Sequence, residues 1–311
     1  MAHVTFIHGI ANKPPADELL QVWRRALADA TDPLPLGDLG VTTSLVYWAD
    51  LMYDKPQPDA SAEESVAETA VDASCSAEAP QPANAEEAAF IASLRARMTA
   101  LSAAQLAAAD TPAVLPAGQG TLERVPLPWF IKKRIMDIFL RDVHHYLFDT
   151  EFAPPGRTPV HIQKTIRQRF VDAVCGQNIS RPHIVVSHSM GTVIAYDCLK
   201  RVAACANVDG LITIGSPLGL DEIQDKLHPE WTRPNGFPRE KVAKDWINIY
   251  DRLDPVCGFD PQLANDYRER DAGVVKDLVV ENDGAWRHSA TKYLRQPVFR
   301  ESLRNMLELQ S

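Results

Sequence analysis

The sequence predicts an α/β protein with a mostly parallel sheet of about six strands, covered by helices on both faces. Short apolar runs rich in β-branched residues, such as IVV at 184–186 and LITI at 211–214, alternate along the chain with segments of helical periodicity. Strands buried on both faces of a parallel sheet form continuous apolar runs of this kind. The 311 residues are enough for one large core, or for one core plus a cap.

The elements are predicted as follows. Apolar runs predict strands at 4–7, 41–48, 184–186, 211–214, 246–250 and 274–280. Apolar residues three or four positions apart predict helices at 17–29, 86–109, 124–148, 162–174, 193–199 and 298–309. Prolines interrupt the segment 221–239, which we expect to be irregular. No strand is expected before residue 4, so the sheet is predicted to be a minimal one.

The alternation of strands and helices breaks between residues 53 and 158. We therefore expect 1–52 and 159–311 to form the two parts of the core, with 53–158 as a cap or insertion. Within the insertion, the acidic stretch 56–85 is rich in Ala, Glu, Pro and Ser and is predicted to be disordered. The remainder, 86–150, is predicted to be helical.

Charge and hydropathy argue against two classes of function. The net charge is −9, but residues 56–94 hold eight acidic side chains and no Lys or Arg, so the rest of the chain is near neutral. A near-neutral body argues against nucleic-acid binding. No run of 18 apolar residues predicts a membrane span. The apolar stripe within 129–148 favours a cap helix packed on the core, and it leaves peripheral contact with a lipid surface open.

The cysteines and the first residues bear on the compartment. The beginning of the chain, MAHVTFIHG, lacks the pattern of a signal peptide. Five cysteines are an odd number without metal-ligand spacing, which predicts reduced thiols and a cytoplasmic location. No metal site and no cofactor are predicted, and the oligomeric state is left undetermined.

A serine motif lies between a predicted strand and a predicted helix. The residues SHSMG at 187–191 follow the apolar run 184–186, and helical spacing begins directly after them. This is the arrangement of the nucleophile elbow G-x-S-x-G, with Ser187 in place of the first glycine. The sharp turn predicts a strained backbone at Ser189 and requires small residues at Ser187 and Gly191. The backbone N–H of Met190 is then positioned to stabilise an oxyanion.

A second signal follows the first predicted strand. His8, Gly9 and Ile10 form a glycine-bearing loop there. In acyl-transfer folds of this type, such a loop supplies the other N–H of the oxyanion hole. Ile10 is the first choice for this donor and Gly9 the second, while His8 is expected to orient the loop.

Three loops at the carboxyl ends of predicted strands carry the residues of a catalytic triad. Ser189 follows one strand, Asp254 follows another, and His288 follows the last. Functional loops of an open parallel sheet gather at that edge, and the order Ser, Asp, His is that of the α/β-hydrolase triad. His183 and His228 are weaker candidates than His288, because His183 opens its strand at the wrong edge and His228 precedes the acid.

The chain resembles the α/β-hydrolase superfamily in these motifs, which span nearly its whole length. The string SHSMGTVIAYD at 187–197 and the segment DVHHYL at 142–147 also look locally like intracellular lipases and phospholipase A1-type members. The resemblance implies that Asp254, which stands before Pro255 and Val256, is the acid. Asp251 is the alternative acid and Asp260 a more distant third.

The resemblance implies a serine hydrolase that cleaves carboxylic esters, with lipid esters as one candidate class. Ser189 would form the acyl-enzyme, His288 would be the base and Asp254 its partner. An acyltransferase or a thioesterase could use the same triad with another leaving group or acceptor. A non-catalytic binding or signalling module of the same fold is the alternative from another class, and the complete triad counts against it.

Overall fold

The computed structural model describes residues 2–29, 31–57, 80–109, 129–176, 179–257, 260–270, 272–284 and 286–309. For 101–109 and 129–132, the backbone alone is described. Most of the acidic stretch predicted to be disordered, residues 58–79, therefore lies outside the described residues. The same holds for the beginning of the helix predicted at 124–148.

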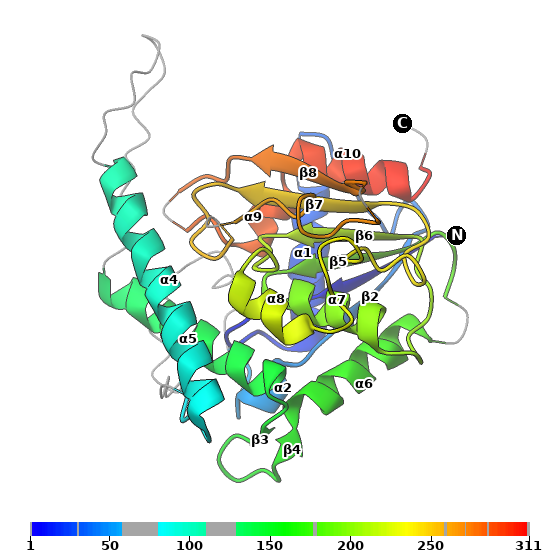
Figure 1. Ribbon diagram of the computed structural model, residues 1–311. Helices are drawn as coiled ribbons and strands as arrows, with labels where there is room; N and C mark the ends of the chain where they lie inside the picture. Colours follow the sequence, from blue (N-terminus) through cyan, green and yellow to red (C-terminus); the bar gives the residue numbers. More distant parts are fainter. Residues whose placement is uncertain are drawn as a thin grey trace.

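A six-stranded parallel sheet forms the centre of the molecule, as the sequence predicts (Figure 1). The strand order is β2-β1-β5-β6-β7-β8, and every neighbouring pair is parallel. The strands are β1 (His3–Ile7), β2 (Thr42–Val46), β5 (His183–His188), β6 (Gly210–Ile214), β7 (Trp246–Asp251) and β8 (Val275–Val280). Because all six run in one direction, the loops after β1, β5, β6, β7 and β8 leave the same edge of the sheet.

Helices cover both faces of this sheet (Figure 1). They are α1 (Ala16–Ala28), α2 (Ala49–Met52), α4 (Ala85–Ala109), α5 (Trp129–Leu147), α6 (Ile162–Val174), α7 (Met190–Arg201), α8 (Asp221–Leu227), α9 (Ala290–Leu294) and α10 (Pro297–Met306). The side chains of successive residues in β5 point to opposite faces of the sheet. Ile184 and Val186 pack with α1, α9 and α10, whereas Val185 packs with α6 and α7. The β-branched run thus fills two cores at once.

The predicted helices of the insertion are present as α4 and α5, which lie side by side (Figure 1). The apolar stripes predicted for them are buried where side chains are described, as for Phe90 and Leu94 of α4 and Phe139 and Val143 of α5. A buried polar contact joins the two helices, because Glu87 accepts a hydrogen bond from His144 Nε2 at 2.8 Å. Helix α5 also packs on the body of the protein, because its buried apolar residues share one core cluster with residues of α6 and α7.

Five short elements were not predicted. Residues 221–239 were expected to be irregular, but they begin with α8, a helix of seven residues that buries Ile223 and Leu227. Helices α2 and α9 have four and five residues, and β3 (Glu151–Phe152) pairs with β4 (Val160–His161) in an antiparallel hairpin. Helices this short gain their stability from tertiary burial rather than from local propensity. Their sequences therefore carry little periodic signal.

Among the described cysteines, Cys175, Cys198, Cys205 and Cys257 are all free thiols. Within the described part of the chain, no helix combines the length and the hydropathy that crossing a bilayer requires.

Candidate active site

Ser189 lies on the sharp turn between β5 and α7. Its backbone has φ 55° and ψ −128°, a conformation that costs free energy for a residue with a side chain. The surrounding backbone holds the turn, since the Ser189 N–H donates to Ile214 O of β6 at 3.0 Å. The Ser189 carbonyl in turn accepts the Thr192 N–H at 2.9 Å. The strained serine expected from the motif is therefore present, and its side chain is fully buried.

The small residues on either side of Ser189 are explained by close neighbours. A Cβ placed at Gly191 would lie 2.6 Å from His8 O and 2.8 Å from Ile7 O, at the end of β1. Ser187 is buried, and its hydroxyl donates to Ile212 O of β6 at 3.1 Å. Met190 is the first residue of α7, so its N–H is one of those that intrahelical bonds leave available.

The loop after β1 passes directly beside Ser189. A Cβ at Gly9 would lie 2.5 Å from Ser189 Cβ and 3.0 Å from Ser189 Oγ, so only glycine allows this approach. Ile10 follows Gly9 and lines the same cavity as Ser189. The two candidate donors from this loop, Ile10 and Gly9, are thus brought close to the serine hydroxyl.

His8 fixes this loop from behind. The Trp48 backbone N–H donates to His8 Nε2 at 3.0 Å, and His8 Nδ1 lies 2.8 Å from Gly9 O. Because Nε2 accepts, Nδ1 carries the proton and donates to the Gly9 carbonyl. Burial, helped by the charge of Lys13, lowers the pKa of His8 to about 3, so the ring stays neutral in this tautomer. The orienting role expected for His8 agrees with these contacts.

Asp254 and His288 form a buried pair after β7 and β8. His288 Nδ1 donates to Asp254 Oδ2 at 2.8 Å, and neither side chain is more than 3% exposed. The other carboxylate oxygen, Oδ1, accepts the Val256 N–H at 2.8 Å. When the ring is neutral, donation from Nδ1 leaves the lone pair on His288 Nε2. Among the described residues, neither His288 Nε2 nor Ser189 Oγ has a hydrogen-bond partner.

Tyr293 of α9 supports the acid, and the sequence did not identify it. Its hydroxyl donates to Asp254 Oδ2 at 2.7 Å and accepts the Asp251 N–H at 3.1 Å. Burial on its own would raise the pKa of Asp254. The electrostatic interaction with His288 and the hydrogen bonds from His288, Tyr293 and the Val256 N–H outweigh burial and hold the pKa of Asp254 below its ordinary value. Asp254 is therefore a carboxylate at neutral pH.

Gly215, directly after β6, makes room for this pair. Its φ is +55°, and a Cβ there would lie 3.0 Å from Asp254 Oδ2 and 3.1 Å from the His288 ring. These distances place the loop after β6 directly beside the Asp254–His288 pair.

The alternative acids make different contacts. Asp251 Oδ2 accepts the Asn282 N–H at 2.7 Å and an Arg287 N–H at 2.9 Å, while Oδ1 accepts the Leu253 N–H at 2.8 Å. Asp251 thus ties the loop after β8 to the end of β7. The backbone of Asp260 faces Gly219.

The weaker histidine candidates also lie elsewhere. His183 begins β5, at the opposite edge of the sheet from Ser189, and bonds Thr5. His228 directly follows α8, where its ring packs edge-on against Trp231.

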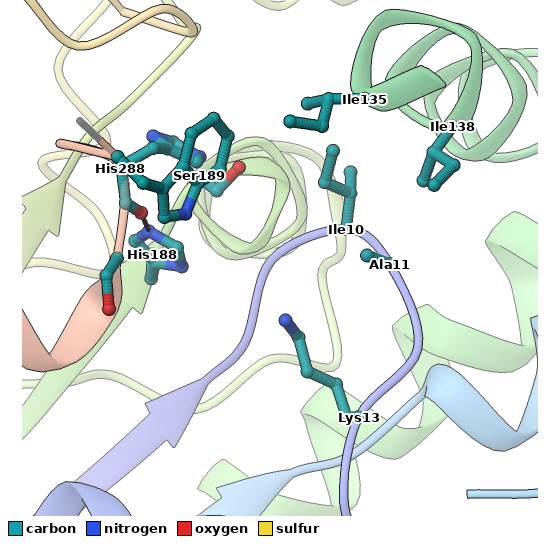
Figure 2. A pocket seen from close by; sticks show the side chains of 10 residues that line it. Ile10, Ala11, Lys13, Ile135, Ile138, His188, Ser189 and His288 are labelled. Atoms are coloured by element: carbon teal, nitrogen blue, oxygen red, sulfur yellow. Dashed lines mark hydrogen bonds between the residues drawn. The ribbon is translucent and has the colours of Figure 1, made fainter. Parts of the chain in front are cut away.

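Ser189 and His288 open into one small cavity (Figure 2). Its volume is about 40 Å³. Apolar side chains from the loop after β1, from α5 and from the loop after β8 make up most of its wall: Ile10, Ala11, Ile135, Ile138 and Trp286. The cap helix therefore forms part of the site.

Three further polar residues border this cavity: His188, Lys13 and Ser289. His188 Nε2 donates to His288 O at 2.8 Å, which connects the elbow to the histidine loop. Burial, together with the charges of His288 and Lys13, holds the pKa of His188 well below its usual value, so the ring is neutral. In Figure 2 the Lys13 ammonium is directed toward the space between His188 and Ile10.

Within the described ranges, no group of three or more His, Cys, Asp or Glu side chains could hold a metal ion. Ser189, Asp254 and His288 bring a buried hydroxyl, a carboxylate and an imidazole to this edge of the sheet.

No protein-family model matches this chain, and a search of curated proteins gives no significant match.

Proposed function

We propose that the chain has the α/β-hydrolase fold and acts as a serine hydrolase on carboxylic esters, with lipid esters as a candidate class. One observation carries the proposal. A strained, buried Ser189 shares a cavity with His288, whose Nδ1 is held by the carboxylate of Asp254. Nucleophile, base and orienting acid are the three parts of a triad, which is recognised by geometry and roles.

In the acylation step, Ser189 Oγ attacks the acyl carbonyl carbon and its proton passes to His288 Nε2. Asp254 stabilises the imidazolium that forms, because its carboxylate accepts the Nδ1–H at 2.8 Å. The N–H groups of Met190 and Ile10 stabilise the oxyanion. The ester C–O bond then breaks, His288 returns the proton to the leaving alcohol, and Ser189 remains acylated.

In the second step, His288 takes a proton from water as the water oxygen attacks the acyl-enzyme. The same N–H groups stabilise the second oxyanion. As this intermediate collapses, the bond from the acyl carbon to Ser189 Oγ breaks and His288 returns its proton to Oγ, which releases the carboxylic acid and free Ser189. The apolar wall formed by Ile10, Ile135 and Trp286 supports an acyl chain as the group bound there.

Labelling with a fluorophosphonate probe tests this proposal. Wild type should be labelled, and Ser189→Ala should not. Ser302→Ala is the matched control, because Ser302 is a buried serine on α10 whose hydroxyl bonds Val298 O. Hydrolysis of p-nitrophenyl esters should fall at least about 10³-fold in Ser189→Ala and stay unchanged in the control.

The outcomes separate the alternatives. Labelling that persists in a folded Ser189→Ala would contradict the assignment of the nucleophile. A folded wild type that neither labels nor hydrolyses any ester would favour a non-catalytic module. If the wild type hydrolyses esters, a series of acyl-chain lengths would measure how much the cavity, about 40 Å³ in this structure, can enlarge.

A further inference from the structure

The helix α5 reaches the loop after β1 through one buried carboxylate. The Ala11 N–H donates to Asp142 Oδ2 at 3.1 Å, across 131 positions of sequence. Asp142 is 1% exposed and Ala11 is 6% exposed. A hydrogen bond to an ionised acceptor that is shielded from water is stronger than one between neutral groups.

Ala11 needs such a contact because of its backbone. Its φ is +72°, in the left-handed region that residues with a Cβ rarely occupy. Strained positions of this kind persist only where the surroundings over-determine them. At Ala11, the bond to Asp142 supplies that constraint.

Asp142 is itself held in place. Arg141 donates to its other oxygen, Oδ1, from Nε at 3.0 Å and from Nη2 at 2.7 Å. The Arg141 guanidinium also lies over the ring of Tyr53, 4.7 Å from its centre. With Oδ1 fixed by Arg141, Oδ2 is directed at the Ala11 N–H. Tyr53, Arg141, Asp142 and Ala11 are therefore linked by successive contacts.

We propose that Asp142 is a positioning residue for the oxyanion hole. Fixing the Ala11 N–H orients the peptide plane between Ile10 and Ala11 and so restricts rotation about the Cα–C bond of Ile10. The peptide plane between Gly9 and Ile10, which carries the Ile10 N–H, is held from its other side by His8 Nδ1 at Gly9 O. The Ile10 N–H is the donor assigned to the oxyanion above, and this inference rests on that proposed function. The insertion that carries α5 is then required for catalysis as well as for the wall of the cavity.

The substitution Asp142→Asn tests this inference. It removes the charge and one of the acceptor oxygens while keeping the shape. Asp137→Asn is the matched control on the same helix, where Asp137 pairs with Arg95 at 3.3 Å. The measurements are kcat and KM with p-nitrophenyl butyrate, the melting temperature, and the Ki of a trifluoromethyl ketone, whose adduct with Ser189 carries an oxyanion.

We expect kcat to fall about 10- to 100-fold in Asp142→Asn, less than the loss from removing an oxyanion donor outright. KM should stay within about twofold, and the Ki of the ketone should rise by a factor similar to the fall in kcat. If Asp142 were only structural, its substitution would lower the melting temperature without this selective loss of kcat and of affinity for the ketone, whose adduct is tetrahedral. The control should match wild type in all four measurements.

Unchanged kcat and Ki in Asp142→Asn would overturn the inference and leave the serine-hydrolase proposal intact. A wild type that neither labels nor hydrolyses esters would overturn both. If Asp142→Asn does not fold, Arg141→Gln keeps the carboxylate and removes its support. For Arg141→Gln we expect a smaller loss of kcat and of affinity for the ketone, with KM preserved. If neither changes, the positioning role of Asp142 is contradicted.

Discussion

Replacing Asp254 by asparagine distinguishes the two carboxylates that the sequence left as candidates for the acid. The Asp254 carboxylate accepts three short hydrogen bonds, from the Nδ1–H of His288, the hydroxyl of Tyr293 and the Val256 N–H. An asparagine offers one acceptor oxygen and an NH₂ group. If the oxygen keeps the Val256 N–H, the NH₂ group faces the imidazole, which must then accept at Nδ1 and carry its proton on Nε2.

The size of the effect follows from this change of tautomer. With a proton on Nε2, His288 cannot accept the proton of Ser189, and the imidazolium also loses its partner at 2.8 Å. For the well-studied triad of chymotrypsin-like proteases, the corresponding substitution lowers kcat by about 10⁴. We expect a fall of about 10³- to 10⁴-fold in Asp254→Asn, or about 4–5.5 kcal/mol of transition-state stabilisation.

Asp251→Asn is the matched control, and its effect should be mainly on stability. Asp251 holds the N–H groups of Leu253 and Asn282 and the guanidinium of Arg287, and makes no hydrogen bond to the imidazole. We expect about 2–4 kcal/mol of lost stability. In the fraction that remains folded, kcat should stay within about tenfold of wild type.

The assay is ester hydrolysis corrected for the folded fraction, which urea unfolding measures. Asp254→Asn should be folded and nearly inactive, and Asp251→Asn should be less stable and active. A folded Asp254→Asn that keeps more than a tenth of wild-type kcat, beside an inactive Asp251→Asn, would refute the reasoning and assign the acid to Asp251.

Two further predictions concern a glycine and the buried histidines. Gly215→Ala should lose at least about tenfold in kcat, because its Cβ would crowd the carboxylate and imidazole at 3.0–3.1 Å, on top of the strain at φ +55°. Gly40→Ala is the control for the backbone strain alone, because Gly40 has φ +71° and open space where a Cβ would lie. It should lower the free energy of unfolding by about 1 kcal/mol and leave kcat unchanged. Equal effects of the two substitutions on kcat would contradict the steric argument. Burial lowers the pKa of His8 to about 3 and that of His183 to about 4, so both are neutral in the fold and charge on unfolding below pH 6.5. Their contribution to the free energy of unfolding is fully present above pH 6.5 and should be lost as the pH falls toward those values, by about 1.4 kcal/mol per pH unit for each histidine. Urea unfolding between pH 7 and pH 4 measures this slope, and a flat profile would contradict it.

The sheet could be predicted because its strands are apolar runs that fill both faces. The run at 184–186 lies within β5, and the run at 211–214 lies within β6. Helices as short as α2 and α9 could not be found this way, since burial by distant parts of the chain stabilises them. The strand predicted at 41–48 ends at Val46 in the structure. Trp48 instead occupies the N-cap position of α2, and its backbone N–H donates to His8 Nε2.

The site was partly predictable for a related reason. Ser189, Asp254 and His288 each follow a recognisable strand, so the parallel topology alone gathers them at one edge. The residues that hold them carry no such signal. Tyr293 lies 39 positions from the acid it bonds, and Asp142 lies 131 positions from Ala11. Only the packed structure shows that these hydroxyl and carboxylate groups have partners in the site.

These supporting contacts come from two short helices and from the insertion. Trp48 lies at the start of α2, Tyr293 on the five-residue α9, and Asp142 on α5 of the insertion. Each of them fixes one part of the site: the His8 loop, the acid, and the backbone next to Ile10. Catalytic groups must be held to within about 0.5 Å of productive geometry by the residues around them. A chain that kept the sheet and the three triad residues but lost these segments should therefore fold its core and still lack an ordered active site.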